Sequence, residues 1–366
     1  MSERFDTVIV GAGVVGLAIA RELAQQGREV LVLERHRKPG EETSSRNSGV
    51  IHSGIYYPTG SLKARMCVRG RALLYAYCAG HDLAYRRCGK LIVCQDQQRP
   101  ALDTLLARAW ANGVDDLVAL EAREVHELEP KIQCAAALYS PSTGIVEVHE
   151  LLLALLGDLE AHGGAVVFGT SVEDVELDGA EIVARAVSGR ELVPIRCGSL
   201  INAAGLGAVN LLRRMRGYPE PLLRPAFYAK GCYFSLRGAR PFRHLVYPMP
   251  DEAGLGIHAT LDLDGSTRFG PNVVWVDRPE YSVDERYVAE FYESVRTYWP
   301  ELEDGALQPG YAGVRPKLVG PGAHATDFVV EGHEEHGCAG LVNLLGIESP
   351  GLTCALAIAE YVASLV

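Results

Sequence analysis

The stretch TVIVGAGVVGLAIARELAQQGREVLVLE, from Thr7 to Glu34, decides the fold. A β-branched run at 7–10 leads into glycines spaced as G-x-G-x-x-G over 11–16. Apolar residues then recur at helical spacing, and a second apolar run at 28–33 ends at the acidic residue. This order predicts a strand, a glycine turn, a helix, a second strand and a terminal carboxylate.

Each position in this unit has a physical reason. Gly11 permits a tight turn, Gly13 lets the backbone approach a pyrophosphate, and Gly16 lets the helix lie close to the strand. The helix start offers free N–H groups to phosphates. Glu34 has the spacing expected of a carboxylate that binds an adenosine ribose. The unit therefore predicts dinucleotide binding, and a buried βαβ unit without a ligand is the alternative.

Composition excludes several classes of function. The 366 residues suffice for two domains, and 35 basic against 46 acidic residues give a net charge of −11, which argues against a nucleic-acid partner. The nine cysteines contain no C-x-x-C pair, so we expect reduced thiols rather than a zinc site or disulfides. Arg21 and Glu22 interrupt the N-terminal apolar run, so we expect no signal peptide and a cytoplasmic protein. Peripheral contact with the inner face of a membrane stays open.

The two chain ends have the same layout. The C-terminal segment predicts a strand at 341–345, a turn at 346–351 and a helix at 352–365, with Ser349 as N-cap and Pro350 at the first helical position. Both ends are therefore assigned to one nucleotide-binding domain. Between them, short alternating strands over 225–276 predict an antiparallel sheet. The predicted fold class is α/β, or α+β overall.

Two polar segments have alternative interpretations. The hydroxyl-rich run 43–48 can hydrogen-bond phosphate, ribose and heteroaromatic edges, or it can be a solvated turn. The His-Glu-Glu-His sequence at 333–336 lacks the H-E-x-x-H spacing, so we expect a solvated loop and no metal site.

Four motifs together resemble the D-amino-acid-oxidase superfamily of FAD enzymes. They are the N-terminal fingerprint, SLINAAG at 199–205, Gly-Val-Arg-Pro at 313–316 and Gly-x-x-Ser-Pro-Gly-Leu-Thr at 346–353. Within the superfamily, SRNSGVIHSGIYY at 45–57 closely resembles the L-2-hydroxyglutarate dehydrogenase/oxidase family. Further agreement lies in 61–64, 88–93, 247–250 and 256–258.

The resemblance implies a Rossmann-like FAD-binding domain and an inserted antiparallel-sheet substrate domain. The expected boundaries are 1–80, 145–220 and 320–366 for the FAD domain, and 81–144 and 221–319 for the substrate domain. The implied flavin site consists of Gly11, Gly13, Val14, Val15, Gly16, Glu34, Arg35, Thr43, Ser44, Ser45, Asn47, Ser48, Gly49, His52, Ser53, Val172, Ala203, Ala204, Gly205, Gly313, Arg315, Gly346, Ser349, Pro350, Gly351, Leu352 and Thr353.

The implied reaction is hydride transfer from a 2-hydroxy acid to flavin N5, with L-2-hydroxyglutarate and 2-oxoglutarate as the first candidate pair. The electron acceptor stays open between oxygen, a quinone and a partner flavoprotein. An amino-acid or amine oxidase of the same superfamily is the alternative, and a non-catalytic FAD-binding subunit is a third.

The reaction needs a base and a carboxylate ligand. His52 and His258 are the candidate bases, because histidine suits proton transfer near neutrality, and His52 could instead carry the flavin covalently. Arg315 is the first candidate to bind a carboxylate, since a guanidinium does so through two hydrogen bonds. A second carboxylate would need one of four further side chains, Tyr57, Tyr247, Lys317 and Lys230. The helix that begins at Pro350 can direct N–H groups at the reduced flavin.

Overall fold

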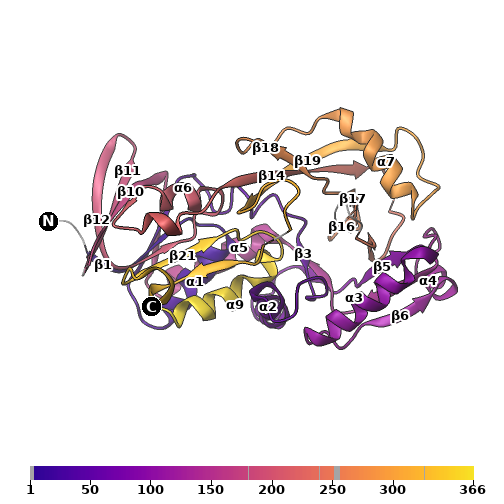
Figure 1. Cartoon of the computed structure of the whole chain (residues 1–366), viewed down its shortest axis with the longest axis horizontal. Coiled ribbons are helices and arrows are strands. Elements are labelled where there is room, and N and C mark those ends of the chain that lie inside the picture. The colour runs from indigo at the N-terminus through magenta and orange to yellow at the C-terminus, as the bar shows by residue number, and fades with distance from the viewer. Residues whose placement is uncertain (1–3, 180, 239, 251–255, 325) are drawn as a thin grey trace. The chain divides into compact units, whose positions relative to one another are not determined.

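The computed structural model describes residues 4–179, 181–238, 240–250, 256–324 and 326–366. The chain divides into two compact units, each built from segments that are far apart in sequence (Figure 1). The first unit contains Met1–Ser45, Val148–Tyr228 and Arg315–Val366. The second unit contains Arg46–Glu147 and Ala229–Val314.

The first unit is organised on a mixed sheet. Its strands follow the order β13-β10-β11-β12-β1-β2-β9, and β21 pairs with both β12 and β20. β1 lies between β12 and β2 and is parallel to both, as a Rossmann-like core requires. The bounds are β1 Arg4–Val10, β2 Val30–Glu34, β9 Ala165–Phe168, β10 Thr170–Asp178, β11 Glu181–Ser188, β12 Glu191–Asn202, β13 Met215–Arg216, β20 Val329–Glu331 and β21 Leu341–Leu345.

The helices of the first unit join the two chain ends. Helix α1, Val14–Gln25, follows the glycine turn and buries Leu17, Ile19 and Leu23. It contacts α5, Val148–Ala161, and α9, Gly351–Ala363, so the C-terminal helix packs directly on the N-terminal one. The remaining helices of this unit are short: η2 Gly205–Gly207, α6 Ala208–Leu212, η3 Glu220–Leu222 and α8 His333–His336.

The second unit is built on a larger mixed sheet and a small three-stranded one. The large sheet follows the order β18-β14-β17-β16-β15-β5-β7-β6, with β19 also paired to β14, and the small sheet follows the order β3-β8-β4. The bounds are β3 Val50–Ile51, β4 Tyr85–Arg86, β5 Lys90–Cys94, β6 Val118–Glu121, β7 Ala136–Ser140, β8 Gly144–Val146, β14 Phe227–Leu236, β15 Leu245–Pro248, β16 Ala259–Leu261, β17 Thr267–Phe269, β18 Val274–Val276 and β19 Leu307–Lys317.

Helices and aromatic side chains complete the second unit. Phe234 and Phe291 lie in contact in its core, with ring centroids 4.6 Å apart, and neither is exposed. This packing holds α7 against β14. The helices are α2 Leu62–Gly80, η1 Asp96–Gln98, α3 Arg99–Ala111, α4 Ala122–Leu128, η4 Glu285–Tyr287 and α7 Val288–Arg296.

The mixed α/β fold is confirmed, and several details of the prediction are wrong. The large sheet of the second unit is not purely antiparallel, because β15 runs parallel to β5. Helix α9 begins at Gly351 with Pro350 as its N-cap, so the predicted N-cap, Ser349, is one residue early. β12 is one unbroken strand that pairs with β11 along its first half and with β1 along its second.

Two further expectations differ from the structure. The sequence 333–336 forms the short helix α8, and His336 is buried beside Tyr218, so the segment is not simply a solvated loop. Residues 46–80 belong to the second unit, whereas the predicted boundaries place them with the chain ends. The reason is that β3 pairs with β8, whose strand partner β4 lies in the same unit. The binding role assigned to each domain stays a prediction.

Candidate functional site

A pocket in the first unit opens where β1 and β2 end. Ten of the predicted flavin-site residues line it: Gly11, Gly13, Glu34, Arg35, Thr43, Ser44, Val172, Ala203, Ala204 and Gly205. The parallel pairing of β1 with β12 brings the glycine turn and residues 203–205 to the same edge of the sheet. A pocket at this edge is where doubly wound sheets bind nucleotides.

The glycines of the turn allow close backbone contacts. Gly11 has a φ of +105°, and a Cβ there would lie 2.7 Å from the carbonyl oxygen of Ala203. A Cβ on Gly16 would overlap the carbonyl oxygen of Gly11, so this glycine lets α1 lie against the turn. Gly13 differs, because its Cβ would meet only the Ser44 hydroxyl, at 3.1 Å. Gly13 lines the pocket, and its missing side chain leaves room there for a phosphate.

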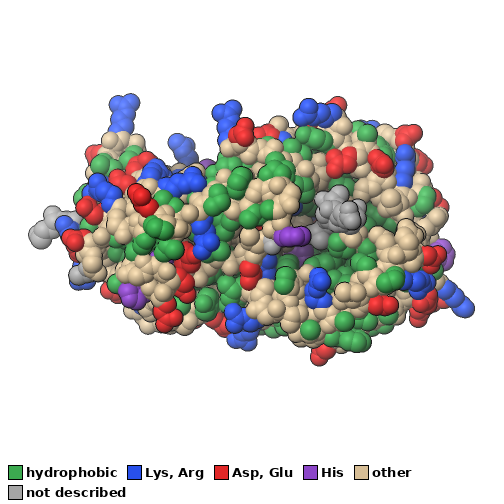
Figure 2. Space-filling model, viewed as in Figure 1, with side chains coloured by type: hydrophobic (Ala, Val, Ile, Leu, Met, Phe, Trp, Pro, Cys, Tyr) green, Lys and Arg blue, Asp and Glu red, His purple; other side chains and the backbone are tan. Residues whose placement is uncertain are grey.

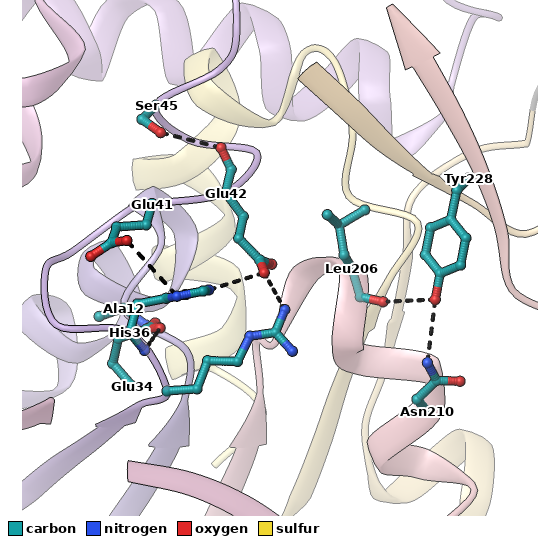
Figure 3. A network of polar contacts seen from close by, with 10 residues as sticks. Ala12, Glu34, His36, Glu41, Glu42, Ser45, Leu206, Asn210 and Tyr228 are labelled. Carbon is teal, nitrogen blue, oxygen red and sulfur yellow. Dashed lines mark hydrogen bonds and ion pairs between the residues drawn. The ribbon is translucent and has the colours of Figure 1, made fainter. Parts of the chain in front are cut away.

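Glu34 is held in a fixed position at the pocket (Figure 3). One carboxylate oxygen accepts a hydrogen bond from the backbone N–H of Ala12 at 2.7 Å, and the other accepts from that of His36 at 2.8 Å. The carboxylate is 7% exposed. Each of its oxygens can accept a further hydrogen bond, so it could bind ribose hydroxyl groups of a dinucleotide.

The first turn of α1 has the features of a phosphate site. It contains no acidic residue, and its N-cap is a glycine without a capping side chain. The Ser44 hydroxyl lies beside it and accepts a hydrogen bond from Val14 N–H at 3.0 Å. These residues fit the pyrophosphate and ribose of a dinucleotide such as FAD. Val15 lies within α1 and does not line the pocket.

Sequence reasoning missed about half of the lining. The missed side chains include His36 and Glu42, which contact each other at 3.0 Å (Figure 3). Glu42 also pairs with Arg35. The polar composition of residues 35–48, which follow Glu34, could have indicated them. The other lining residues that were not predicted are Val10, Leu33, Gly40, Glu41, Thr170, Ser171, Leu206, Gly207, Leu211 and Arg214.

The second unit gathers a cluster of titratable side chains around Lys90, and we call it the Lys90 cluster: His52, Tyr56, Lys90, Tyr247 and His258. The Lys90 ammonium lies 4.8 Å from the ring centroid of Tyr56 and 4.9 Å from that of Tyr247. Tyr247 in turn stacks on His258, with centroids 3.6 Å apart and planes 9° apart. The structure therefore brings both candidate bases and Tyr247 together, and adds a lysine that the sequence analysis did not select.

Burial and mutual repulsion shift the pKa values in this cluster. Burial first, and then the charges of Lys90 and His258, lower the pKa of His52 to about 3. Burial lowers the pKa of Lys90 to about 7, opposed by the nearby Cys67 thiol. Burial also raises the pKa values of Tyr56 and Tyr247. His52 is therefore neutral near pH 7, as a general base must be.

Several predicted residues have structural partners instead. The Ser53 hydroxyl is fully buried between the hydroxyls of Ser140 and Thr143, at 3.0 and 3.1 Å. Lys230 pairs with Glu280, and Lys317 with Glu348 at 2.7 Å. Each of these two lysines already has a carboxylate partner, which weakens the prediction that it binds substrate.

Other predicted residues shape the backbone. Asn47 accepts the N–H of Gly49 through its side chain at 2.6 Å and the Tyr311 hydroxyl through its carbonyl at 2.7 Å. A Cβ on Gly313 would overlap the carbonyl oxygen of Arg46, which explains a glycine there. The Tyr57 carbonyl accepts a hydrogen bond from Asn112 at 2.9 Å.

The predicted flavin residues are divided between the two units. Those of the second unit are Asn47, Ser48, Gly49, His52, Ser53 and Gly313. Those of the first unit outside the pocket include Ser45, Arg315, Gly346, Ser349, Pro350, Gly351, Leu352 and Thr353. The last five surround the start of α9, whose first turn carries no acidic residue and no side-chain cap, so its N–H groups could face negative charge.

The surface and the helices give further information. On the face shown in Figure 2, acidic and basic side chains are interspersed. Among the residues that the structure describes, no helix is long and apolar enough to cross a membrane, and no group of three His, Cys, Asp or Glu side chains could hold a metal ion. All nine cysteines are free thiols.

Known structures share this fold over the whole chain. An FAD-bound L-α-glycerophosphate oxidase from Mycoplasma pneumoniae has a TM-score of 0.87 at 24% identity, covering 99% of this chain and 94% of that chain. A glycine oxidase from Geobacillus kaustophilus has a TM-score of 0.83 at 21% identity, covering 100% and 95%. The fold is thus that of flavin-dependent oxidases.

The family follows from sequence comparison. The model of the DAO family, described as FAD dependent oxidoreductase, matches residues 6–365, and the chain belongs to this family. FAD is therefore its cofactor. It is 44% identical over 405 residues to the mitochondrial L-2-hydroxyglutarate dehydrogenase of Arabidopsis thaliana, covering 99% of this chain and 83% of the relative. The L-2-hydroxyglutarate dehydrogenase of Salmonella houtenae is 31% identical, with 99% and 93% covered.

Proposed function

We propose that this protein oxidises L-2-hydroxyglutarate to 2-oxoglutarate with FAD as its electron acceptor. The names of its relatives support the substrate, and one observation supports the chemistry: the Lys90 cluster places a neutral histidine beside a buried cation. The pocket residues of the first unit would hold FAD, which would supply a two-electron hydride acceptor for C2 of the hydroxy acid. The hydroxyl proton leaves to a protein base, so that a C=O bond forms.

His52 is the proposed base. Its pKa is far below that of free histidine, so the ring carries no proton near neutrality, as a base requires, and the same low pKa makes it a weak base in the substrate-free protein. His258 contributes to that low pKa through its own charge, and it is packed parallel to Tyr247. His52 is the better candidate because the residue as a whole keeps more exposure than His258, which is only 6% exposed.

Arg315 is the proposed ligand of the carboxylate next to the reacting carbon. A guanidinium binds a carboxylate through two parallel hydrogen bonds, which orient it as well as hold it. Arg315 lies on β19, two residues after Gly313, whose close contact with Arg46 fixes the strand there. In this proposal the pocket of the first unit holds FAD, and Arg315 belongs to the same unit as that pocket.

The direct test is anaerobic reduction of the purified holoenzyme. L-2-Hydroxyglutarate should bleach the visible band of the oxidised flavin, with one 2-oxoglutarate formed per flavin. D-2-Hydroxyglutarate and L-glutamate are the comparison substrates. Bleaching by L-glutamate alone would replace the proposal with an amino-acid oxidase, and no bleaching by any substrate would favour a binding subunit.

The Arg315→Met variant separates an enzyme from a binding module. We expect retained FAD and a rate of bleaching at sub-saturating substrate that falls by about 30-fold or more, because a charge-assisted pair is lost. Arg123→Met is the matched control, since Arg123 is exposed and forms its ion pair with Glu127 of the same helix. A module would show no difference between the two variants. The acceptor that reoxidises the reduced flavin, a cytoplasmic location and membrane contact stay predictions.

A further inference from the structure

Lys90 occupies an unusual place for a lysine. It is the first residue of β5, paired on one side with Leu245 of β15 and on the other with Ser140 of β7. Its side chain is only 1% exposed. Lysine is almost never buried to this degree unless its charge is paired, because removal of an ammonium group from water is costly.

No described residue supplies an anion that compensates this charge. Among the residues that the structure describes, no carboxylate lies within ion-pair distance of Lys90, and its side chain makes no hydrogen bond. The groups that face it are the rings of Tyr56 and Tyr247, the Cys67 thiol of α2 and the His52 ring. The two aromatic faces stabilise a cation only in part.

A second donor in the cluster also lacks an acceptor. The Tyr56 hydroxyl is buried and has no hydrogen-bond partner among the described residues. Buried polar groups are normally paired, and an unpaired one indicates a missing partner. A cation and a hydroxyl that both donate, and that both lack an acceptor, match the requirements of a bound carboxylate.

The other lysines considered for this role are occupied. Lys230 pairs with Glu280, and Lys317 pairs with Glu348, so neither is available without breaking an existing ion pair. We propose that Lys90, assisted by the Tyr56 hydroxyl, binds the second carboxylate of the substrate, the one distant from the reacting carbon. This inference rests on the proposed function, and it makes Lys90 the residue that selects dicarboxylic over monocarboxylic hydroxy acids.

Binding of a carboxylate at Lys90 also affects the basicity of His52. The charge of Lys90 is one of the causes that keep His52 unprotonated. A carboxylate on Lys90 offsets that charge, so His52 becomes a stronger base when a dicarboxylate is present. A monocarboxylate leaves the charge of Lys90 uncompensated, so it gains neither the ion pair nor the increase in the basicity of His52.

The test uses glutarate and butyrate as unreactive probes of the FAD-loaded protein, with affinity measured by calorimetry and by the shift of the flavin spectrum. In the wild type, glutarate should bind more tightly than butyrate. Lys90→Met should lower the affinity for glutarate by about 30-fold or more, since a buried charge pair is lost. Its affinity for butyrate should stay within about threefold of that of the wild type. Lys131→Met is the matched control, because Lys131 is a half-exposed lysine of the same unit, paired with Glu301.

Specific outcomes would overturn the proposal. Equal affinity of the Lys90→Met and Lys131→Met variants for glutarate would do so, and so would a wild type without preference for glutarate over butyrate. If Lys90→Met does not fold, the wild type still decides: its glutarate affinity should weaken as pH rises above 7, while its butyrate affinity should not. Bleaching by L-2-hydroxyglutarate is scored separately, so glutarate binding that depends on Lys90 without bleaching would support this site and reject the proposed substrate.

Discussion

The ring of His258 lies parallel to that of Tyr247, with centroids 3.6 Å apart and an interplanar angle of 9°. The Lys90 ammonium also lies over the Tyr247 ring, 4.9 Å from its centroid. One aromatic side chain therefore positions both a candidate base and the cation proposed to bind substrate. Substitutions of Tyr247, Lys90 and His52 can separate what each side chain contributes to stability and to flavin reduction.

Tyr247 should act through its ring rather than its hydroxyl. Tyr247→Phe keeps the stacked face and should retain stability and flavin bleaching within about threefold, whereas Tyr247→Leu should lose about 3 kcal/mol of unfolding free energy and at least tenfold in bleaching rate. Urea unfolding and stopped-flow absorbance would measure the two effects. A Phe variant as impaired as the Leu variant would assign the role to the hydroxyl.

Lys90→Met should stabilise the substrate-free protein below pH 7. The pKa of Lys90 is about 7 in the folded protein against 10.5 for free lysine, so between these values the unfolded chain binds more protons and wild-type stability rises with pH. The variant lacks this dependence. We expect it to be more stable by about 1–3 kcal/mol at pH 6, with the advantage vanishing near pH 10.

Chemical denaturation at pH 6 and pH 9 would measure this difference. A variant that is less stable than the wild type at pH 6 would show that Lys90 is stabilised in the free protein and does not await an anion. The Lys131→Met control should show no pH-dependent difference, since that side chain is half-exposed.

His52→Gln should affect both rate and acid stability. Loss of a general base lowers a proton-transfer rate by about 100-fold or more, so flavin bleaching should slow by that factor at pH 7. The pKa of His52 is about 3 when folded against 6.5 when free, so wild-type stability falls as pH drops from 6.5 towards 3. The variant should lose stability less steeply over this range.

The exposed His126 on α4 provides the control for that experiment, as His126→Gln should change neither quantity. Bleaching by the His52→Gln variant at the wild-type rate would transfer the role of base to His258. If the variant bleaches slowly but loses stability between pH 6.5 and pH 3 as steeply as the wild type, His52 is already accessible to protons in the folded state.

Gly13→Ala should weaken FAD binding without unfolding the protein. Gly13 has an ordinary φ of −74°, and a Cβ there meets only the Ser44 hydroxyl at 3.1 Å, so the apoprotein should tolerate it within about 1 kcal/mol. The added methyl group occupies space at the phosphate site, so FAD affinity should fall by at least tenfold. Apoprotein melting and fluorescence titration with FAD would separate the two.

Gly157→Ala is the matched substitution in a helix of the same unit, where a Cβ meets nothing within 4 Å. It should raise stability by up to about 1 kcal/mol and leave FAD affinity unchanged, because alanine is the better helix former. Equal FAD affinity in the two variants would show that the backbone at Gly13 does not approach the cofactor.

Local sequence patterns predict the nucleotide-binding core and about half of the residues that line its pocket. The turn at Gly11, the helix after Gly13 and the carboxylate of Glu34 depend on short-range patterns, because strand, turn and helix are encoded within a few residues of each other. The strand 341–345 was located for the same reason. Only the cap of α9 shifted, by one residue.

Only the tertiary structure revealed the Lys90 cluster. In sequence, Lys90 is a single charge at the start of an apolar strand, which is more often a solvated end than a site. Its burial arises because β15 and β7, from distant parts of the chain, pair on either side of β5 and bring Tyr247 over its ammonium. Such a contact depends on long-range strand pairing, which no local pattern around Lys90 encodes.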